Sequence, residues 1–259
     1  MYYSHYAAPS SVEEAWALNQ KKSNHILAGG LWLRFMKQPF DTAIDLKNLS
    51  LDRIEILSDC IRIGSSVTLH QMETDNFLNA MTGNAFRSAL QNIVGVQFRN
   101  AATVGGTIFS RFGFSDLIPL LLVLDASVTI YGGEYRTVPF REFLDLPFSR
   151  DLIISVELPK KNRKVICRSQ RMSSTGFPVL VCDTAISDGL FLTAIGARPS
   201  HAKLIEQIPK ETASDFITRV QSDLRYESNL MGSDTYRRHL VGVFLKKSIT
   251  DLTEGGIIS

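Results

Sequence analysis

Two glycine pairs, each placed after a short apolar stretch, constrain this chain more than any other feature. In the first, Leu27-Ala-Gly-Gly-Leu31, an apolar run stops at two glycines and a helix is expected to begin. Glycine has no Cβ, so another group can approach the backbone closely at such a corner. The open N–H groups of a helix start can hold a pyrophosphate. A Gly-Gly turn by itself is also an ordinary connection between two elements.

The second glycine pair lies in Arg99-Asn-Ala-Ala-Thr-Val-Gly-Gly-Thr107. Here Thr103 and Thr107 add hydroxyl donors beside the glycines. The chain has no GxGxxG and no GxxxxGK[ST] segment, which excludes the usual Rossmann and P-loop sites. Two separate corners of this kind still favour a ligand with a diphosphate group.

Composition excludes several classes of protein. The 28 basic and 26 acidic residues are mixed along the chain and give a net charge of only +2, so we expect no nucleic-acid partner. Cys60, Cys167 and Cys182 lie far apart, which suits a reducing cytoplasm better than a disulfide framework. The strongly apolar run 117–124 is too short to cross a bilayer, and no leader segment is evident. We expect a cytoplasmic protein with no membrane partner.

The first 159 residues are predicted to form two α/β subdomains. In the first, about residues 1–52, Ser11 and Glu14 form a capping box for a helix over 11–21, and residues 31–37 suit a second helix. The second, about residues 53–159, contains alternating strand-like segments followed by helical ones. It also carries a buried-looking helix at 116–125 and a hairpin that turns at Gly132-Gly133.

Residues 160–259 are predicted to form a smaller α+β domain. Strand-like runs are joined at Asp188-Gly189, a typical hairpin turn. Ser233 is a suitable N-cap for a final helix. The predicted buried stripe of that helix consists of Tyr236, Leu240, Val243 and Phe244.

Residues that usually bind metals or act as nucleophiles are scattered. The five histidines lie far apart, and no HExxH or GxSxG segment is present. We therefore name no metal ligand and no catalytic acid, base or nucleophile, and we expect no iron–sulfur centre in this chain.

Taken in order, six segments give the chain a specific resemblance to a known family. They resemble the FAD-binding (medium) subunit of molybdenum hydroxylases, of the xanthine dehydrogenase and carbon monoxide dehydrogenase type, over nearly the whole chain. The segments are Leu27-Ala-Gly-Gly30, Ile61-Arg-Ile-Gly-Ser-Ser-Val-Thr-Leu69, Arg99-Asn-Ala-Ala-Thr-Val-Gly-Gly106, Ser115-Asp-Leu-Ile-Pro-Leu-Leu-Leu122, Leu152-Ile-Ile-Ser-Val-Glu-Leu-Pro159 and Ser233-Asp-Thr-Tyr-Arg-Arg-His-Leu240.

The resemblance implies an α+β fold. Its first part is a two-subdomain FAD-binding module (PCMH-like), followed by a smaller C-terminal α+β domain of the CO dehydrogenase flavoprotein type. The domain boundary predicted above, between residues 1–159 and 160–259, agrees with this order. FAD is expected to lie extended between the pieces.

The resemblance also implies which residues hold FAD. The pyrophosphate is expected to contact two loops, namely Leu27, Ala28, Gly29, Gly30, Leu31, Trp32 and Leu33, and Thr103, Val104, Gly105, Gly106 and Thr107. Asp116 is expected near the ribose or adenine, and Ile93, Ile153 and Arg168 are expected to line the flavin or adenine pockets. From the residues alone, Asp116 is equally suited to an N-cap, the two isoleucines to the core, and Arg168 to a solvated face.

Three departures from the family pattern affect the expected site. Leu31-Trp32 stands where the family usually has a hydroxyl residue and then Asp or Asn, so a donor to phosphate is lost. Thr107 replaces a usual Asn and has a shorter reach. At residues 175–178 the family commonly has an acidic residue, an apolar one and Ala, so the flavin environment is expected to differ. Loss of one charge-assisted hydrogen bond weakens binding by roughly tenfold or more.

If the resemblance holds, this chain is an oxidoreductase subunit that transfers electrons. A large partner subunit would carry the molybdenum cofactor, a small one the [2Fe-2S] clusters, and the FAD here would pass electrons to an acceptor such as NAD or oxygen. No histidine or cysteine adjoins the first glycine pair, so non-covalent FAD is expected. Two alternatives remain open, namely a degenerate scaffold subunit with weak or no FAD binding, and a stand-alone flavoenzyme.

Overall fold

The computed structural model describes residues 2–254 and contains two compact units. Each unit is assembled from three segments of chain, so chain order and packing do not coincide. These units are defined by packing, so they do not test the domain boundary expected at residues 159/160, which stays a prediction. We call the two the N-terminal unit, made of the residues up to Gln71, Val96–Ser110 and Asp125–Lys160, and the C-terminal unit, made of Met72–Gly95, Arg111–Leu124 and the residues from Lys161 onward.

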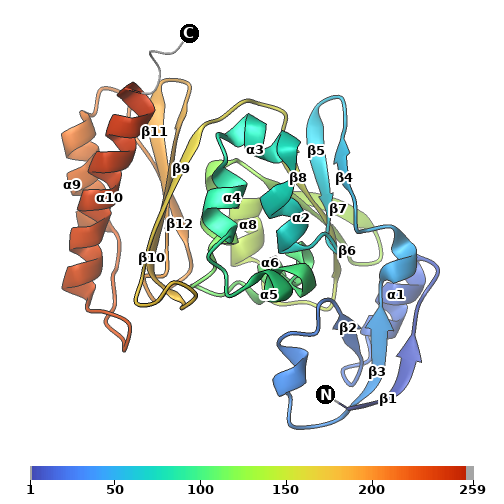
Figure 1. Cartoon of the computed structure of the whole chain (residues 1–259). Coiled ribbons are helices and arrows are strands. Elements are labelled where there is room, and N and C mark those ends of the chain that lie inside the picture. The colour runs from blue at the N-terminus through green and yellow to red at the C-terminus, as the bar shows by residue number, and fades with distance from the viewer. Residues whose placement is uncertain (1, 255–259) are drawn as a thin grey trace. The chain divides into compact units, whose positions relative to one another are not determined.

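A small parallel sheet begins the N-terminal unit (Figure 1). Its strands are β1 (Tyr3–Ala7), β3 (Phe40–Asp45) and β2 (His25–Leu27), in that spatial order. Helix α1 (Val12–Asn19) covers it, and the hydroxyl of Ser11 accepts the N–H of Glu14 at 3.2 Å, so the predicted cap is confirmed. Apolar burial holds these elements together. The core consists of Ala15, Ile44, Leu46, Tyr131 and Leu152.

The helix predicted over residues 31–37 is wrong. Only one turn of 3₁₀ helix, η1 (Leu33–Phe35), follows the first glycine corner, and a second short one, η2 (Lys47–Leu49), follows β3. Short helices need a buried apolar face for stability. The side chains of Trp32, Phe35 and Met36 instead face solvent.

A five-stranded antiparallel sheet forms the rest of the N-terminal unit. Its order is β4-β5-β8-β6-β7, and the hairpin predicted at Gly132-Gly133 joins β6 to β7. The strands are β4 (Ile54–Ile56), β5 (Cys60–Gly64), β6 (Ser127–Tyr131), β7 (Tyr135–Pro139) and β8 (Leu152–Pro159). Helices α5 (Val96–Ala101), α6 (Val104–Ser110) and α8 (Phe140–Asp145) complete the unit, and α2 (Leu69–Thr74) leads out of it.

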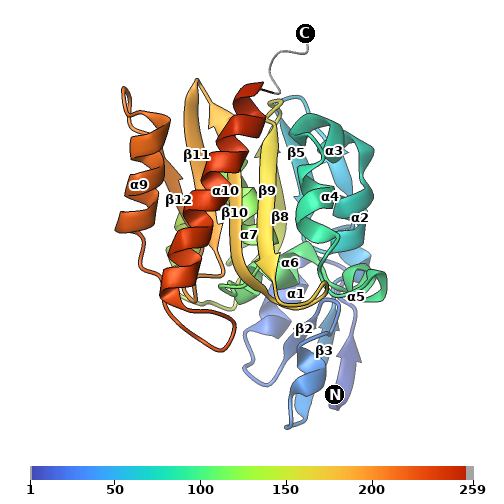
Figure 2. The same cartoon turned by 60° about the vertical axis from the view of Figure 1, so that its left-hand side comes forward.

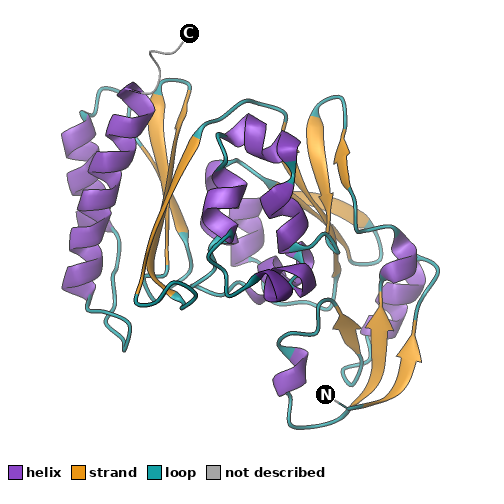
Figure 3. Ribbon diagram, viewed as in Figure 1, coloured by secondary structure: helices purple, strands orange, loops and turns teal. Residues whose placement is uncertain are grey.

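The C-terminal unit is a four-stranded antiparallel sheet with helices on both faces (Figures 1 and 2). Its order is β12-β11-β10-β9, with the predicted turn at Asp188-Gly189 between β10 and β11. The strands are β9 (Val165–Arg171), β10 (Pro178–Ser187), β11 (Leu190–Gly196) and β12 (Lys203–Glu206). The layers of helix and sheet stand out by colour in Figure 3. Helices α9 (Ala213–Asp223) and α10 (Asp234–Glu254) cover one face, and α3 (Asn76–Thr82), α4 (Ala85–Leu90) and α7 (Leu117–Val123) lie on the other side.

Helix α7 confirms the buried helix predicted at 116–125, because every one of its residues is buried. For α10 the N-cap is confirmed, since the Ser233 hydroxyl accepts the N–H of Tyr236 at 3.1 Å. Its predicted stripe is partly wrong: Leu240 is buried, Tyr236 is exposed, and Val243 and Phe244 are half-buried. The buried face of α10 consists of Arg237, Leu240, Val241, Leu245, Ser248, Ile249 and Leu252.

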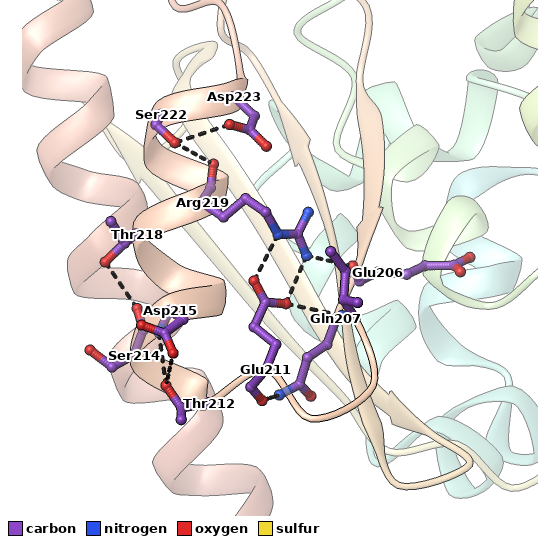
Figure 4. Close-up of polar contacts among 11 residues, drawn as sticks. Glu206, Gln207, Glu211, Thr212, Ser214, Asp215, Thr218, Arg219, Ser222 and Asp223 are labelled. Carbon is purple, nitrogen blue, oxygen red and sulfur yellow. Dashed lines mark hydrogen bonds and ion pairs between the residues drawn. The ribbon is translucent and has the colours of Figure 1, made fainter.

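An arginine on α9 fixes the segment that connects β12 to α9. Figure 4 shows Arg219 on α9, whose guanidinium binds both carboxylate oxygens of Glu211 at 2.7 and 2.9 Å and also the carbonyl of Glu206. Such a bidentate pair fixes direction as well as position. The segment between β12 and α9 is thereby held against the helix.

Among residues 2–254, no helix combines the length and the apolar character that a membrane span requires.

Candidate functional site

The two glycine corners predicted from the sequence lie against each other within the N-terminal unit. A Cβ added to Gly29 would stand 1.6 Å from the carbonyl oxygen of Ala101. A Cβ added to Gly106 would stand 3.4 Å from the Cβ of Ala28. Contacts below 3 Å are sterically forbidden for real side chains, so the end of β2 reaches the α5–α6 junction only because residue 29 is glycine.

The first corner presents open backbone donors. Within residues 2–254, the N–H groups of Gly29, Gly30 and Leu31 make no hydrogen bond. Gly29 is exposed, and Gly30 adopts a φ of +66°, which turns the chain at little steric cost. Unpaired amides at an exposed turn are the donors that an anionic group requires. This corner therefore fits a phosphate or diphosphate.

The second corner has already used its backbone donors. The N–H of Val104 binds the carbonyl of Val67 at 2.9 Å, and that of Gly105 binds Ser65 at 2.8 Å. Gly106 donates to the hydroxyl of Thr103 at 3.2 Å. Because these bonds are internal, the second corner acts mainly as the support against which the first corner rests.

The hydroxyl of Thr107, expected to reach phosphate, has a local partner instead. It donates to the carbonyl of Thr103 at 2.8 Å, the common back-bond of a helical threonine. The Thr103 side chain is itself buried. The hydroxyl donors predicted from the sequence are therefore present but engaged.

The remaining predicted residues are divided between the two units. Ile153, on β8, belongs with the corners and is a core side chain, 9 % exposed, opposite Ile130. Ile93, Asp116 and Arg168 belong to the C-terminal unit. Ile93 is half-buried in the turn after α4.

Asp116 and Arg168 are engaged with protein partners. Asp116 does not cap α7; the hydroxyl of Ser115 takes that role, accepting the N–H of Ile118 at 3.3 Å. The Asp116 carboxylate forms a buried ion pair with Arg171. Burial raises its pKa to about 6, although the positive charge of Arg171 opposes this shift.

Arg168 points toward α10. Its Nε donates to the hydroxyl of Ser248 at 3.0 Å, and its terminal nitrogen pairs with Asp251. The prediction that it lines a flavin or adenine pocket has no support from these contacts.

The sequence reading missed a cavity inside the C-terminal unit. Its volume is about 610 Å³. Phe114 and Phe177, with ring centroids 4.4 Å apart, form an aromatic wall, and His201, Asn229 and Arg237 add polar groups. Phe177 and Pro178, which both line the cavity, belong to the third departure from the family pattern. A wall of this kind suits a planar ring.

A buried arginine was also missed. Arg237 is 1 % exposed, and it donates to the carbonyls of Val179, Ala197, Glu227 and Gly232 and to the side chain of Asn229. Its position one turn before Leu240 and Val241 was the available signal, since residues three and four apart share a helix face.

No group of three or more potential metal ligands exists within residues 2–254. The first corner carries no candidate for a covalent flavin link either. His25, the nearest histidine, packs on Phe40 with ring centroids 5.0 Å apart.

Comparison with known proteins identifies the family. Residues 2–161 match the model of the FAD binding domain in molybdopterin dehydrogenase. The protein YgfM of Escherichia coli K12 is 27 % identical over 255 residues, covering 96 % of both chains. The glyceraldehyde dehydrogenase medium chain of Sulfolobus acidocaldarius is 23 % identical over 276 residues, covering 95 % of this chain and 97 % of the relative.

A solved structure confirms the fold. A chain of carbon monoxide dehydrogenase from Hydrogenophaga pseudoflava superposes with a TM-score of 0.84 at 19 % identity, covering 96 % of this chain and 97 % of that one. The α+β fold of the CO dehydrogenase flavoprotein type is therefore confirmed. Since the matched family domain spans more than half of the chain, this protein belongs to the family of FAD-binding domains in molybdopterin dehydrogenases and is an oxidoreductase component.

Proposed function

We propose that this chain is the FAD-binding electron-transfer subunit of a molybdenum hydroxylase. In this proposal the large partner subunit carries the molybdenum cofactor and the small one carries [2Fe-2S] clusters. Electrons from these clusters reach the FAD, and an acceptor such as NAD or oxygen takes them up. FAD supplies the step between single-electron and two-electron transfer, and the protein positions it and excludes water.

The observation that carries this proposal is the first glycine corner. Three exposed or half-buried residues, whose amides have no partner within residues 2–254, stand at the segment that the family resemblance assigns to the pyrophosphate. We propose that Gly29, Gly30 and Leu31 donate to that group and that Gly105 and Gly106 brace them. Non-covalent attachment fits the packing of His25 on Phe40.

The names of the relatives support the proposed partners, and the cysteines support the proposed location. One relative is named a medium chain, and the carbon monoxide dehydrogenase neighbour is a form that lacks the Mo-pyranopterin moiety of its molybdenum cofactor. The three cysteines are free thiols, in keeping with a cytoplasmic protein.

One observation favours the alternative of a scaffold subunit with weak FAD binding. The donors of the second corner form hydrogen bonds within the protein, and at the first corner Leu31-Trp32 stands where the family usually has a hydroxyl residue. Each lost donor weakens phosphate binding by roughly tenfold or more. Only the affinity for FAD separates the two functions.

A visible absorption spectrum of the purified whole chain tests the proposal. We expect a flavin spectrum, and FAD released into solution when the protein is denatured. In Gly29→Ala the new Cβ meets the carbonyl of Ala101, so the corner must open and bound FAD should fall at least tenfold.

Gly189→Ala provides the matched control. Gly189 has a φ of +79° and nothing within 4 Å of an added Cβ, so the substitution strains a turn without touching the corner. It should retain FAD. A folded wild-type chain that stays colourless with excess FAD would contradict the proposal and favour the scaffold.

A further inference from the structure

The loop that follows the first glycine corner exposes an unusual group of aromatic side chains. Trp32 is 49 % exposed and Phe35 is 64 % exposed, and Met36 also faces solvent. Large apolar side chains gathered in one exposed segment usually mark a contact surface. The indole of Trp32 therefore does not fill the core.

The rings form a platform that also carries positive charge. The ring centroids of Trp32 and Phe35 lie 6.2 Å apart, and the guanidinium of Arg34 stands 4.8 Å above the Phe35 ring. Aromatic rings and arginine planes are the surfaces on which nucleobases stack, whatever the base. We call Trp32, Arg34 and Phe35 the platform.

The platform lies beside the open amides. Trp32 is two residues beyond Gly30, so its Cα stands within about 7 Å of that glycine. A ligand whose diphosphate rests on Gly29, Gly30 and Leu31 extends from there in two directions. The indole of Trp32 lies next to this corner in the chain, within reach of one of the two rings.

We propose that Trp32 stacks on the adenine ring of the dinucleotide whose diphosphate the first corner holds. This inference rests on the proposed function. The exposure of the platform selects adenine over the flavin, because a redox-active ring must be shielded from water whereas the adenine does no chemistry. Stacking by Trp32 compensates for the hydroxyl donor that this chain lacks at the same corner.

Binding of three probes to the whole chain, stripped of flavin, tests this role. FAD carries both rings, ADP carries adenine and diphosphate, and inorganic pyrophosphate carries the diphosphate alone. For Trp32→Ala we expect the affinities for FAD and for ADP to fall by about tenfold each, as for the loss of one stacked base. The affinity for pyrophosphate should stay unchanged.

Indole fluorescence gives a second readout. The chain has two tryptophans, and Trp16 packs on Tyr131 in an edge-to-face contact. ADP should quench the emission of the wild type but not that of Trp32→Phe, which retains only Trp16. Trp32→Phe keeps a stacking ring, so its ADP affinity should stay within about threefold of the wild type.

Tyr135→Ala, which removes another exposed aromatic side chain, is the control variant and should bind all three probes as the wild type does.

Four outcomes overturn the inference. Equal loss for pyrophosphate would make Trp32 a support of the corner, and loss for FAD without loss for ADP would assign the ring to the flavin. Unchanged ADP affinity in Trp32→Ala overturns it too. If that variant also no longer binds a partner subunit, the platform is a protein interface. In these three cases the proposed function survives, whereas a wild type that binds none of the probes overturns both.

Discussion

The loop after β2 and the loop before α10 differ in how their backbone polar groups find hydrogen-bond partners. Both loops adjoin a regular element, and their N–H and C=O groups lie outside its hydrogen-bond pattern. Before α10, Arg237 fills this need from inside, because its guanidinium reaches the carbonyls of Glu227 and Gly232 at 2.6 and 2.5 Å. After β2, the amides of Gly29, Gly30 and Leu31 have no such partner within residues 2–254.

The difference separates structural polar groups from groups available for binding. A loop whose polar groups are paired internally gains a fixed shape and has little left to offer a ligand. An open loop keeps its donors for an external anion and is less stable without one. The N-terminal unit contains both kinds of loop side by side, since the amides of Val104 and Gly105 are paired, whereas those of the first corner have no partner in the part of the chain that the structure describes.

The largest effect that we predict tests the internally paired loop. Arg237→Ala removes five hydrogen bonds and leaves buried carbonyls without a donor, so the free energy of unfolding of the C-terminal unit should fall by about 4 kcal/mol or more. Hydrogen exchange across residues 213–254 would show the loss. Tryptophan fluorescence should change little, because Trp16 and Trp32 both belong to the N-terminal unit.

Arg225→Ala is the matched control for this prediction. The Arg225 side chain is 83 % exposed, and within residues 2–254 its one ion pair is with Glu227, so its removal should cost less than about 0.5 kcal/mol. A loss below about 1 kcal/mol in Arg237→Ala would show that the loop holds its shape without the guanidinium, and the contrast between the two loops would disappear.

The architecture was largely predictable from local signals. The N-cap at Ser11, the turn at Asp188-Gly189 and the apolar run of α7 depend on neighbouring residues, and the structure confirms each of them. The helix expected over 31–37 failed because its side chains have no core to face. Arg237 escaped prediction because a buried arginine is stabilised by carbonyls from distant segments.

The site was predictable only in part. The sequence identified both glycine corners, and the structure brings them together. It did not reveal that the amides of the second corner are hydrogen-bonded within the protein, because their partners Val67 and Ser65 lie far away in the chain. The ion pair of Asp116 with Arg171 likewise depends on a strand 55 residues away.

A buried carboxylate is one exception to internal pairing in the C-terminal unit. Asp183, on β10, is fully buried, and neither of its oxygens has a hydrogen bond of normal geometry within residues 2–254. The thiol of its cross-strand neighbour Cys167 donates to the carbonyl of Ala85. Burial, reinforced by the negative charge of Asp116, raises the pKa of Asp183 well above its usual value.

This exception predicts how stability depends on pH. A carboxyl whose pKa is raised on folding binds more protons in the folded chain, so the free energy of unfolding is highest below the unfolded pKa of about 4. It falls as pH rises through the folded pKa values of Asp183 and of Asp116, the latter being about 6. The C-terminal unit should therefore be less stable at pH 8 than at pH 5.

Asp183→Asn removes the charge and keeps the shape. It should stabilise the C-terminal unit by about 1 kcal/mol or more at pH 8 and by much less at pH 5. Thermal unfolding followed by circular dichroism at both pH values measures this. Asp188→Asn, in the exposed turn after β10, should change neither curve, and an equal gain at both pH values in Asp183→Asn would rule out the charge as the cause.

The smallest predicted effect concerns the segment shown in Figure 4, which is also paired internally but lies at the surface. Arg219→Lys keeps the charge and loses the two-point contact with Glu211, so the free energy of unfolding should fall by only about 0.5 to 1 kcal/mol at pH 7. The arginine, by hydrogen bonding, lowers the pKa of Glu211, so the difference between the two proteins should vanish as pH falls through that pKa. Urea unfolding at pH 7 and at pH 3 measures it. A loss as large as that of Arg237→Ala would mean that surface and buried arginines brace loops equally, and that burial does not decide how firmly a loop is held.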